Sequence, residues 1–241
     1  MPRGRFVAEV SALALALGTA SCSSADVNSA SPTAPPGPPG PPIAVNEAPL
    51  SRLHGTRLVP PLARPSQVLR DTAGAPFSIA DRPEDELMLL FFGYTHCPDV
   101  CPTTMADLAS ARSQLPAVLR DRVTVAFVTE DPERDTPRAL RRWLDGFDPS
   151  FVGLRGGNGA TKAMLDQLYL PRTKLVEKPE DPIAHPDTGA PHHHHGQYGV
   201  EHAGVLYAFA PGERTVIYTG GTKPSEYAAD FIRLVRGAGG G

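Results

Sequence analysis

The chain has 241 residues, a formal net charge of -3 and 41% hydrophobic residues. This is enough for one ordinary domain of about 150 residues plus extensions. The acidic balance and the lack of a basic stripe argue against nucleic acid as a partner. The 27 prolines and 23 glycines are concentrated in particular stretches, which indicates that parts of the chain lie outside the folded domain.

Residues 1–22 are typical of a secretory signal. Arg3 and Arg5 precede a short apolar run at 10–17, and small residues then lead to Cys22. The run is too short to span a bilayer as a helix. The layout resembles a bacterial lipoprotein signal, in which Cys22 is lipidated and becomes the N-terminus. The alternatives are a plain secreted protein cleaved nearby and an uncleaved anchor.

The next stretch, residues 23–65, is rich in Ser, Ala, Pro and Gly and includes PTAPPGPPGPPIA. Such a composition cannot bury enough apolar surface to order itself and favours extended polyproline conformations. We therefore expect a disordered tether that holds the folded part away from a membrane. The folded domain is predicted over residues 66–236.

Strands and helices alternate along this domain. A hairpin with its turn at Asp71–Gly74 comes first, and the apolar run Leu87–Phe92 predicts a strand covered on both faces. Two helix–strand pairs follow: a helix over 105–115 with a strand at 122–128, and a helix from Thr136 to Gly146 with a strand at 151–154. A helix at 160–170 then leads into a polar insertion at 171–199. The domain ends with a hairpin of 203–210 with 215–219 and a helix from Pro224 to Gly237. This order predicts an α/β, thioredoxin-like fold with a central mixed sheet flanked by helices.

Cys97 and Cys101 follow the Leu87–Phe92 strand at the start of the next helix. A separation of four residues places both sulfurs on one helix face, about one turn apart. The helix N-terminus favours thiolate over thiol. Two converging thiolates suit Cu(I) or zinc, and the same pair can close a short disulfide. With Cys22 lipidated only two cysteines remain, so three-coordinate Cu(I) fits better than zinc, which prefers four ligands in structural sites.

A third ligand would have to come from another part of the fold. Of the eight histidines, His54 falls in the expected tether, and His185 and His192–His195 fall in the polar insertion. The His96 side chain is expected to point away from the cysteine pair. His202 opens the hairpin strand, and in thioredoxin-like folds the loop entering this strand lies over the thiols. His202 is therefore the candidate ligand, although a solvated or hydrogen-bonded histidine is the alternative.

Three segments, GYTHCPDVCPTTMADL, TEDPERDTP and GVEHAGVLYAFAP, resemble the Sco/SenC family of copper-binding assembly proteins over about residues 67–236. The resemblance implies a thioredoxin fold tethered to the outer side of the membrane by a lipid anchor, with copper bound by Cys97, Cys101 and His202. It also implies delivery of copper to, or reduction of the thiols of, the dinuclear copper site in cytochrome c oxidase subunit two. The family commonly has Asp directly before the ligand histidine, where this chain has Glu201. Glu keeps the charge of Asp but has a longer side chain, so the way in which residue 201 would orient His202 departs from the family pattern.

Several other polar residues are candidates of lower rank. Asp131 and Asp135 could orient the site or a partner, while turn and capping chemistry already explains Asp135. Asp99 is expected to serve the helix start. The His192–His195 run could capture Cu(II), nickel or zinc loosely, or be a tolerated insertion.

Three classes of function remain open on the sequence. The first is a metallochaperone that carries Cu(I), or Cu(II), and has no enzymatic turnover of its own. The second is a thiol–disulfide oxidoreductase without copper delivery, although thioredoxin thiols lie three apart rather than four. The third is a peroxide-reacting or redox-sensing protein with Cys97 as nucleophile. The first two are compatible, because release of copper leaves the dithiol able to react.

Overall fold

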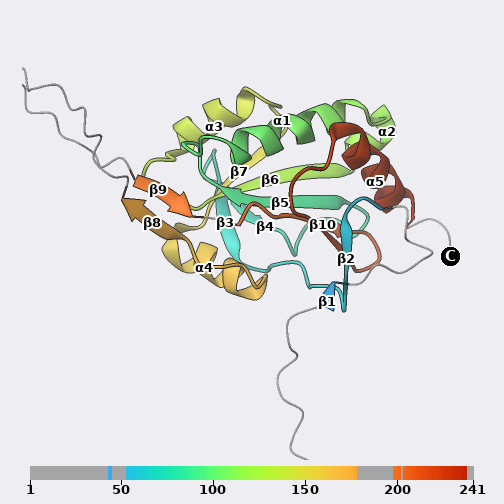
Figure 1. The fold of residues 1–241 in the computed structure, drawn as a ribbon, viewed down its shortest axis with the longest axis horizontal. Helices are drawn as coiled ribbons and strands as arrows, with labels where there is room; N and C mark the ends of the chain where they lie inside the picture. The colour runs from blue at the N-terminus through green and yellow to red at the C-terminus, as the bar shows by residue number, and fades with distance from the viewer. Residues whose placement is uncertain (1–42, 45–52, 178–197, 202, 238–241) are drawn as a thin grey trace, which may run out of the picture. The chain divides into compact units, whose positions relative to one another are not determined.

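The computed structural model describes residues 43–44, 53–177, 198–201 and 203–237. Within these residues a mixed sheet is flanked by helices, which confirms the predicted α/β class (Figure 1). No helix in the described part of the chain is both long and apolar enough to cross a membrane.

The main sheet combines parallel and antiparallel strands. In chain order its strands are β1 (Ile43–Ala44), β2 (Thr56–Val59), β3 (Val68–Asp71), β4 (Pro76–Ser78), β5 (Leu87–Gly93), β6 (Val123–Thr129), β7 (Val152–Arg155), β10 (Leu206–Ala210) and β11 (Arg214–Tyr218). They lie in the order β1-β2-β11-β10-β5-β6-β7-β3-β4. β5, β6 and β7 run parallel, and the other neighbours pair antiparallel. A separate two-stranded sheet pairs β8 (Lys174–Glu177) with β9 (Tyr198–Glu201).

Helices cover both faces of the main sheet. They are α1 (Val100–Ser113), α2 (Ala117–Arg120), α3 (Pro137–Asp145), α4 (Gly157–Gln167) and α5 (Pro224–Arg236). Figure 1 shows α1, α3 and α5 over one face and α4 on the other. Each face has its own apolar cluster, one centred on α1 and α5 and one on α4.

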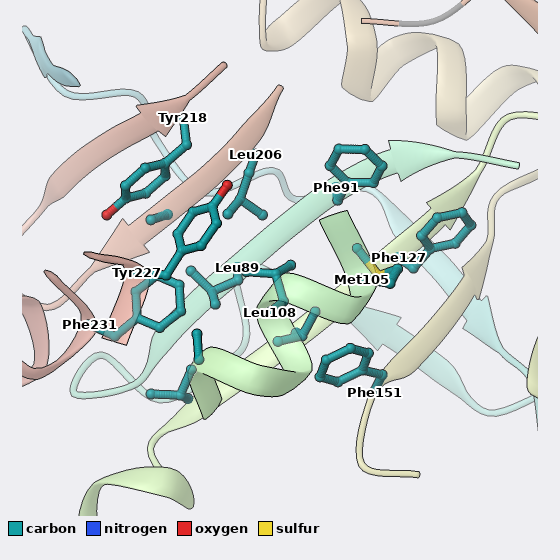
Figure 2. Close-up of a cluster of buried hydrophobic side chains, with 14 of the residues drawn as sticks. Leu89, Phe91, Met105, Leu108, Phe127, Phe151, Leu206, Tyr218, Tyr227 and Phe231 are labelled. Carbon is teal, nitrogen blue, oxygen red and sulfur yellow. The ribbon is translucent and has the colours of Figure 1, made fainter. Parts of the chain in front are cut away.

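β5 is the central strand and is buried at every residue. Its side chains alternate between the two clusters, because successive residues of a strand point to opposite faces. Leu89 and Phe91 pack with Met105 and Leu108 of α1, as Figure 2 shows. The residues on the opposite face are Met88, Leu90 and Phe92. This two-sided burial explains the uniformly apolar sequence that predicted the strand.

Turn and capping signals in the sequence are confirmed where the structure describes them. Asp71 Oδ1 accepts hydrogen bonds from the backbone N–H groups of Ala73 and Ala75 in the β3–β4 turn. The Thr136 hydroxyl accepts from the N–H of Ala139 at 3.2 Å and so caps α3. The last helix begins at Pro224, as predicted.

Several predicted elements differ from the structure. The hairpin strand expected from residue 203 is β10 and begins at Leu206. The helix expected at 160–170 is α4 and begins three residues earlier, because Gly157 takes a positive φ of 59° and starts the helix rather than breaking the chain. The segment 171–199, expected to be a loop, contains β8 and the first half of β9. Its polar composition hides this pairing, since a two-stranded sheet needs little apolar sequence.

The boundary expected between tether and domain at residue 66 is wrong. β2 pairs antiparallel with β11, so Thr56–Val59 belongs to the main sheet. The backbone N–H groups of His54 and Gly55 donate to Asp230 Oδ2 at 2.7 and 3.1 Å. The folded part therefore includes residues from 53 onward, and His54 is part of the domain. Most of the remaining tether and the whole predicted signal lie outside the described residues.

Candidate metal centre

The site begins where β5 ends. After Gly93 the chain turns and enters α1 at Val100, and the N–H of Cys97 donates to the carbonyl of Tyr94 at 3.1 Å inside this turn. Cys101 is the second residue of α1. The central parallel strand thus delivers both cysteines to the first residues of the helix, as predicted.

The two thiols lie against each other. Cys101 is fully buried and Cys97 is 9% exposed. The backbone N–H of Cys101 donates to Cys97 Sγ at 3.4 Å, and no disulfide joins the two residues. The first turn of α1 therefore holds the Cys97 sulfur in place and brings the two side chains together, which is the arrangement that their spacing predicts.

The surroundings of Cys101 favour its neutral form. Burial, followed by the hydrogen bond with Cys97, raises the pKa of the Cys101 thiol well above its usual value. A Cβ atom built on Gly93 would lie 2.6 Å from Cys101 Sγ, so only glycine leaves room for this sulfur beside β5. Cys101 is therefore expected to keep its proton until a bond from its sulfur to a metal ion or to another sulfur replaces the S–H bond.

A pocket of about 500 Å³ adjoins Cys97. It is lined by residues of the cysteine turn and of the segment that forms β8 and β9: Tyr94, Cys97, Pro98, Asp99, Val100, Pro171, Arg172, Lys174 and Val200. Cys97 is thus the sulfur that faces outward, and Cys101 lies behind it. The segment that sequence reasoning assigned to a polar loop supplies one wall of the site.

Asp135 lies behind the cysteine turn and is fully buried. Its carboxylate accepts hydrogen bonds from the Thr95 N–H at 3.0 Å, the Thr95 hydroxyl at 2.5 Å and the Thr129 hydroxyl at 2.6 Å. These bonds join the residues before Cys97 to the end of β6. Turn chemistry alone does not account for this residue, so the orienting role considered for it is the better interpretation.

Asp131 is connected to the Cys97 pocket through the side chains of Arg134 and Tyr94. It is 3% exposed, and its carboxylate accepts a short hydrogen bond from the Nε–H of Arg134. The Arg134 guanidinium lies 5.8 Å from the centre of the Tyr94 ring, which lines the Cys97 pocket. Asp131 thus supports the pocket wall rather than contacting a sulfur in this arrangement.

Glu130 is a buried acid that sequence reasoning missed. Burial raises its pKa to about 7, and its carboxylate accepts a hydrogen bond from the Thr173 hydroxyl just before β8. It lines a second pocket of about 360 Å³. The only sequence signal was a charged residue directly after a buried strand, which is equally common in loops.

The remaining predicted site residues lie outside the described residues or at the ends of described elements. His202, Cys22, His185 and His192–His195 lie outside the described residues, and Glu201 is the last residue of β9. Asp99 occupies the N-cap position of α1 but makes no capping hydrogen bond with its side chain. Within the described part of the chain, no group of three or more His, Cys, Asp or Glu residues could hold a metal ion. The described residues therefore provide two of the three predicted ligands.

Fold and site together define a class of protein. A mixed sheet with helices on both faces, and a dithiol at the start of the helix after its central strand, characterise thioredoxin-like thiol proteins.

The SCO1/SenC family model matches residues 64–236, and the chain belongs to this family. A putative copper-binding protein of Stutzerimonas stutzeri is 32% identical over 149 residues, which cover 62% of this chain and 65% of that protein. The human mitochondrial SCO1 homolog is 30% identical over 182 residues, covering 68% of this chain and 53% of that protein. The chain thus spans between half and two thirds of the length of these curated relatives.

Solved structures agree with the fold. Bradyrhizobium japonicum ScoI with copper bound matches with a TM-score of 0.55 and 28% identity, over 70% of this chain and 96% of that one. The apo Sco1 protein from Thermus thermophilus matches with a TM-score of 0.58 and 29% identity, over 77% and 96%. The predicted thioredoxin-like fold and the predicted family are confirmed.

Proposed function

We propose that this protein is an extracytoplasmic copper metallochaperone, tethered to the membrane through a lipid on Cys22. It binds copper through Cys97, Cys101 and His202 and passes it to the dinuclear site of cytochrome c oxidase subunit two. The observation that carries the proposal is the buried dithiol, in which the N–H of Cys101 contacts Cys97 Sγ at 3.4 Å beside a pocket.

Paired thiols select soft ions, so the cargo is Cu(I) before any harder metal. The imidazole of His202 supplies the third ligand, and its place directly after β9 supports this role because Val200 of β9 lines the Cys97 pocket. Family membership and the copper-bound Bradyrhizobium relative support copper over zinc.

The chain's own residues divide the work of binding. Of the two cysteines, Cys97 borders the pocket and binds the ion first, whereas Cys101 is fully buried and binds it second. Each sulfur gives up one proton as its bond to copper forms. The largely apolar surroundings of Cys101 keep water away from the bound ion, which protects Cu(I) from exchange with solvent.

Copper binding is tested by titrating the reduced full chain with Cu(I) against a competing chelator. We expect about one Cu(I) per protein, since three ligands complete one site, and a loss of binding in Cys97→Ser and Cys101→Ser. His202→Ala should bind more weakly, while His185→Ala should match the parent chain. An unchanged affinity in His202→Ala would refute the three-ligand site.

Delivery and anchoring need separate measurements. Copper loaded on the chain should appear on the copper domain of oxidase subunit two when the two are mixed and separated. Cys22→Ser should move the protein from the membrane fraction to the soluble fraction, because the lipid can no longer be attached. Retention of the variant in the membrane would mean that another segment anchors it.

A thiol–disulfide oxidoreductase that acts on a partner is the second candidate. It is favoured by the hydrogen bond between the two cysteine side chains, since sulfurs this close can close a disulfide with little movement. A reductant of the oxidase thiols must have a lower potential than its target. Equilibration of the dithiol with glutathione buffers measures this potential, and a value above that of the target would exclude the activity.

A further inference from the structure

His96, directly before Cys97, is held by a chain of hydrogen bonds that reaches a buried acid. Its ring Nδ1 lies 3.1 Å from Thr95 Oγ1 and 3.9 Å from Asp135 Oδ1. The His96 side chain is 57% exposed, whereas the Asp135 carboxylate is fully buried. The His96 ring is therefore exposed on the residue before Cys97, with its Nδ1 held in place by Thr95.

The direction of these hydrogen bonds determines which ring nitrogen faces outward. The Thr95 hydroxyl has a single hydrogen, and it is donated to Asp135 Oδ1 at 2.5 Å. Toward His96 the same oxygen can only accept, so Nδ1 carries a hydrogen and donates it. Nε2 is then the nitrogen left with a lone pair for a metal ion, an orientation that buried carboxylates commonly impose on histidine ligands.

We propose that His96 Nε2 is a relay ligand that receives Cu(I) from a donor and hands it to Cys97 and Cys101. Asp135 is the positioning residue, and it acts through Thr95. The inference rests on the proposed function, because it names a step in the loading of the same site. It adds a ligand used during transfer to those that hold the ion at rest.

The burial of the sulfurs is the reason that a relay is needed. Cys101 is fully buried and Cys97 is 9% exposed, so a bulky donor cannot present its ion to both sulfurs at once. Cu(I) must then exchange its ligands one at a time. His96 directly precedes Cys97 in the chain, so an ion taken up at residue 96 has one residue to cross before it reaches the first thiol.

The step balances without a change of oxidation state. One donor–copper bond breaks as the Nε2–copper bond forms. Two copper–sulfur bonds then form as the Nε2 bond and the remaining donor bonds break. The two thiol protons leave to the buffer, and copper stays Cu(I) throughout.

The test is the rate at which the reduced full chain takes Cu(I) from its bicinchoninate complex, followed by stopped flow. We expect roughly tenfold slower uptake in His96→Ala with an unchanged equilibrium affinity. Thr95→Val should also be slowed, whereas Thr95→Ser keeps the hydroxyl and should resemble the parent chain. His54→Gln is the matched control, because it too removes a part-exposed histidine next to a buried carboxylate.

A second measurement needs no copper. Nitrogen-15 spectra of the apo protein should show the His96 hydrogen on Nδ1, and Thr95→Val should shift the population toward the Nε2–H form. Equal uptake rates in the parent chain and His96→Ala would overturn the relay, as would a hydrogen on Nε2 in the parent chain. A weaker equilibrium affinity in His96→Ala would also overturn it, because His96 would then be a resident ligand. No uptake by the parent chain would instead refute the proposed function itself.

Discussion

Gly93 and Cys101 make the closest contact between the scaffold and the site. The missing Cβ of Gly93 leaves the space that Cys101 Sγ occupies, since a Cβ there would lie 2.6 Å from the sulfur and 3.2 Å from the Phe127 ring. Cys101 is fully buried. The position of this sulfur therefore depends on the residue at the end of the neighbouring strand.

Gly93→Ala is expected to displace Cys101 and to weaken Cu(I) binding. Overpacking of this kind costs about 1–3 kcal/mol of unfolding free energy. Chelator competition and thermal unfolding measure the two effects. Gly159→Ala is the control, because no atom lies within 4 Å of its added Cβ, and it should leave copper affinity unchanged. Parent-like affinity and stability in Gly93→Ala would show that the contact is not restrictive.

Glu130 is a second position where a single side chain has a measurable effect. Burial raises its pKa from 4.5 to about 7, so the folded state keeps a proton that the unfolded state has lost between these values. Stability contributed by this group is complete below pH 4.5 and is lost as the pH rises toward 7.

Glu130→Gln should therefore be more stable than the parent chain at pH 8, by up to about 3 kcal/mol. The difference should shrink as the pH falls and vanish near pH 4. Urea unfolding at several pH values measures it, and exposed Glu133→Gln serves as the control. A difference that does not vary with pH would mean that Glu130 titrates normally.

At the scale of elements, α3 begins at a residue that the sequence marks. Thr136 precedes Pro137 and accepts a hydrogen bond from the N–H of Ala139, so α3 starts immediately after Asp135. Thr136→Ala should lower the unfolding free energy by about 1 kcal/mol, and Thr136→Ser should recover most of it. Denaturant titration gives both values, and equal stability of all three chains would rule out the cap.

Local signals predicted these elements well because each depends on neighbours in the chain. The β5 strand, the α3 cap and the β3–β4 turn are all encoded within a few residues. β8 and β9 were missed because their pairing joins segments on either side of a polar stretch. β2 was missed because it follows a proline-rich region and is paired with β11, far along the chain.

The same distinction applies to the site. Cys97 and Cys101 could be found from spacing, since one helix turn brings them together. For Asp135 the sequence left an orienting role and turn chemistry both open, because its contact with Thr95 spans 40 residues and depends on how β5 and β6 end side by side. Glu130 could not be found from the sequence, since its burial depends on the return of the chain at Thr173.

At the scale of the whole molecule, the segment before residue 66 is attached to the last helix. Asp230 of α5 is fully buried and accepts hydrogen bonds from the N–H groups of His54 and Gly55 and from the Tyr218 hydroxyl. β2 follows at once and pairs with β11. The segment that leads toward the proposed membrane anchor is thus bound to the domain through α5 and β11, which come long after the cysteines in the sequence.

A chain starting at residue 53 should therefore unfold cooperatively at nearly the same temperature as the full chain. One starting at residue 66 loses β2 and leaves Asp230 with fewer partners, which should cost at least about 2 kcal/mol. Its newly exposed β11 edge should also promote association. Calorimetry and light scattering compare the two, and equal stability would show that β2 is dispensable.

The central claim is that one copper ion is held by Cys97, Cys101 and His202. X-ray absorption at the copper edge of the reduced, Cu(I)-loaded full chain tests it most directly, with His202→Ala beside it. The account predicts two sulfur neighbours and one imidazole nitrogen, with the imidazole signal lost in the variant. Copper surrounded only by nitrogen and oxygen, or an imidazole signal that persists in His202→Ala, would contradict it.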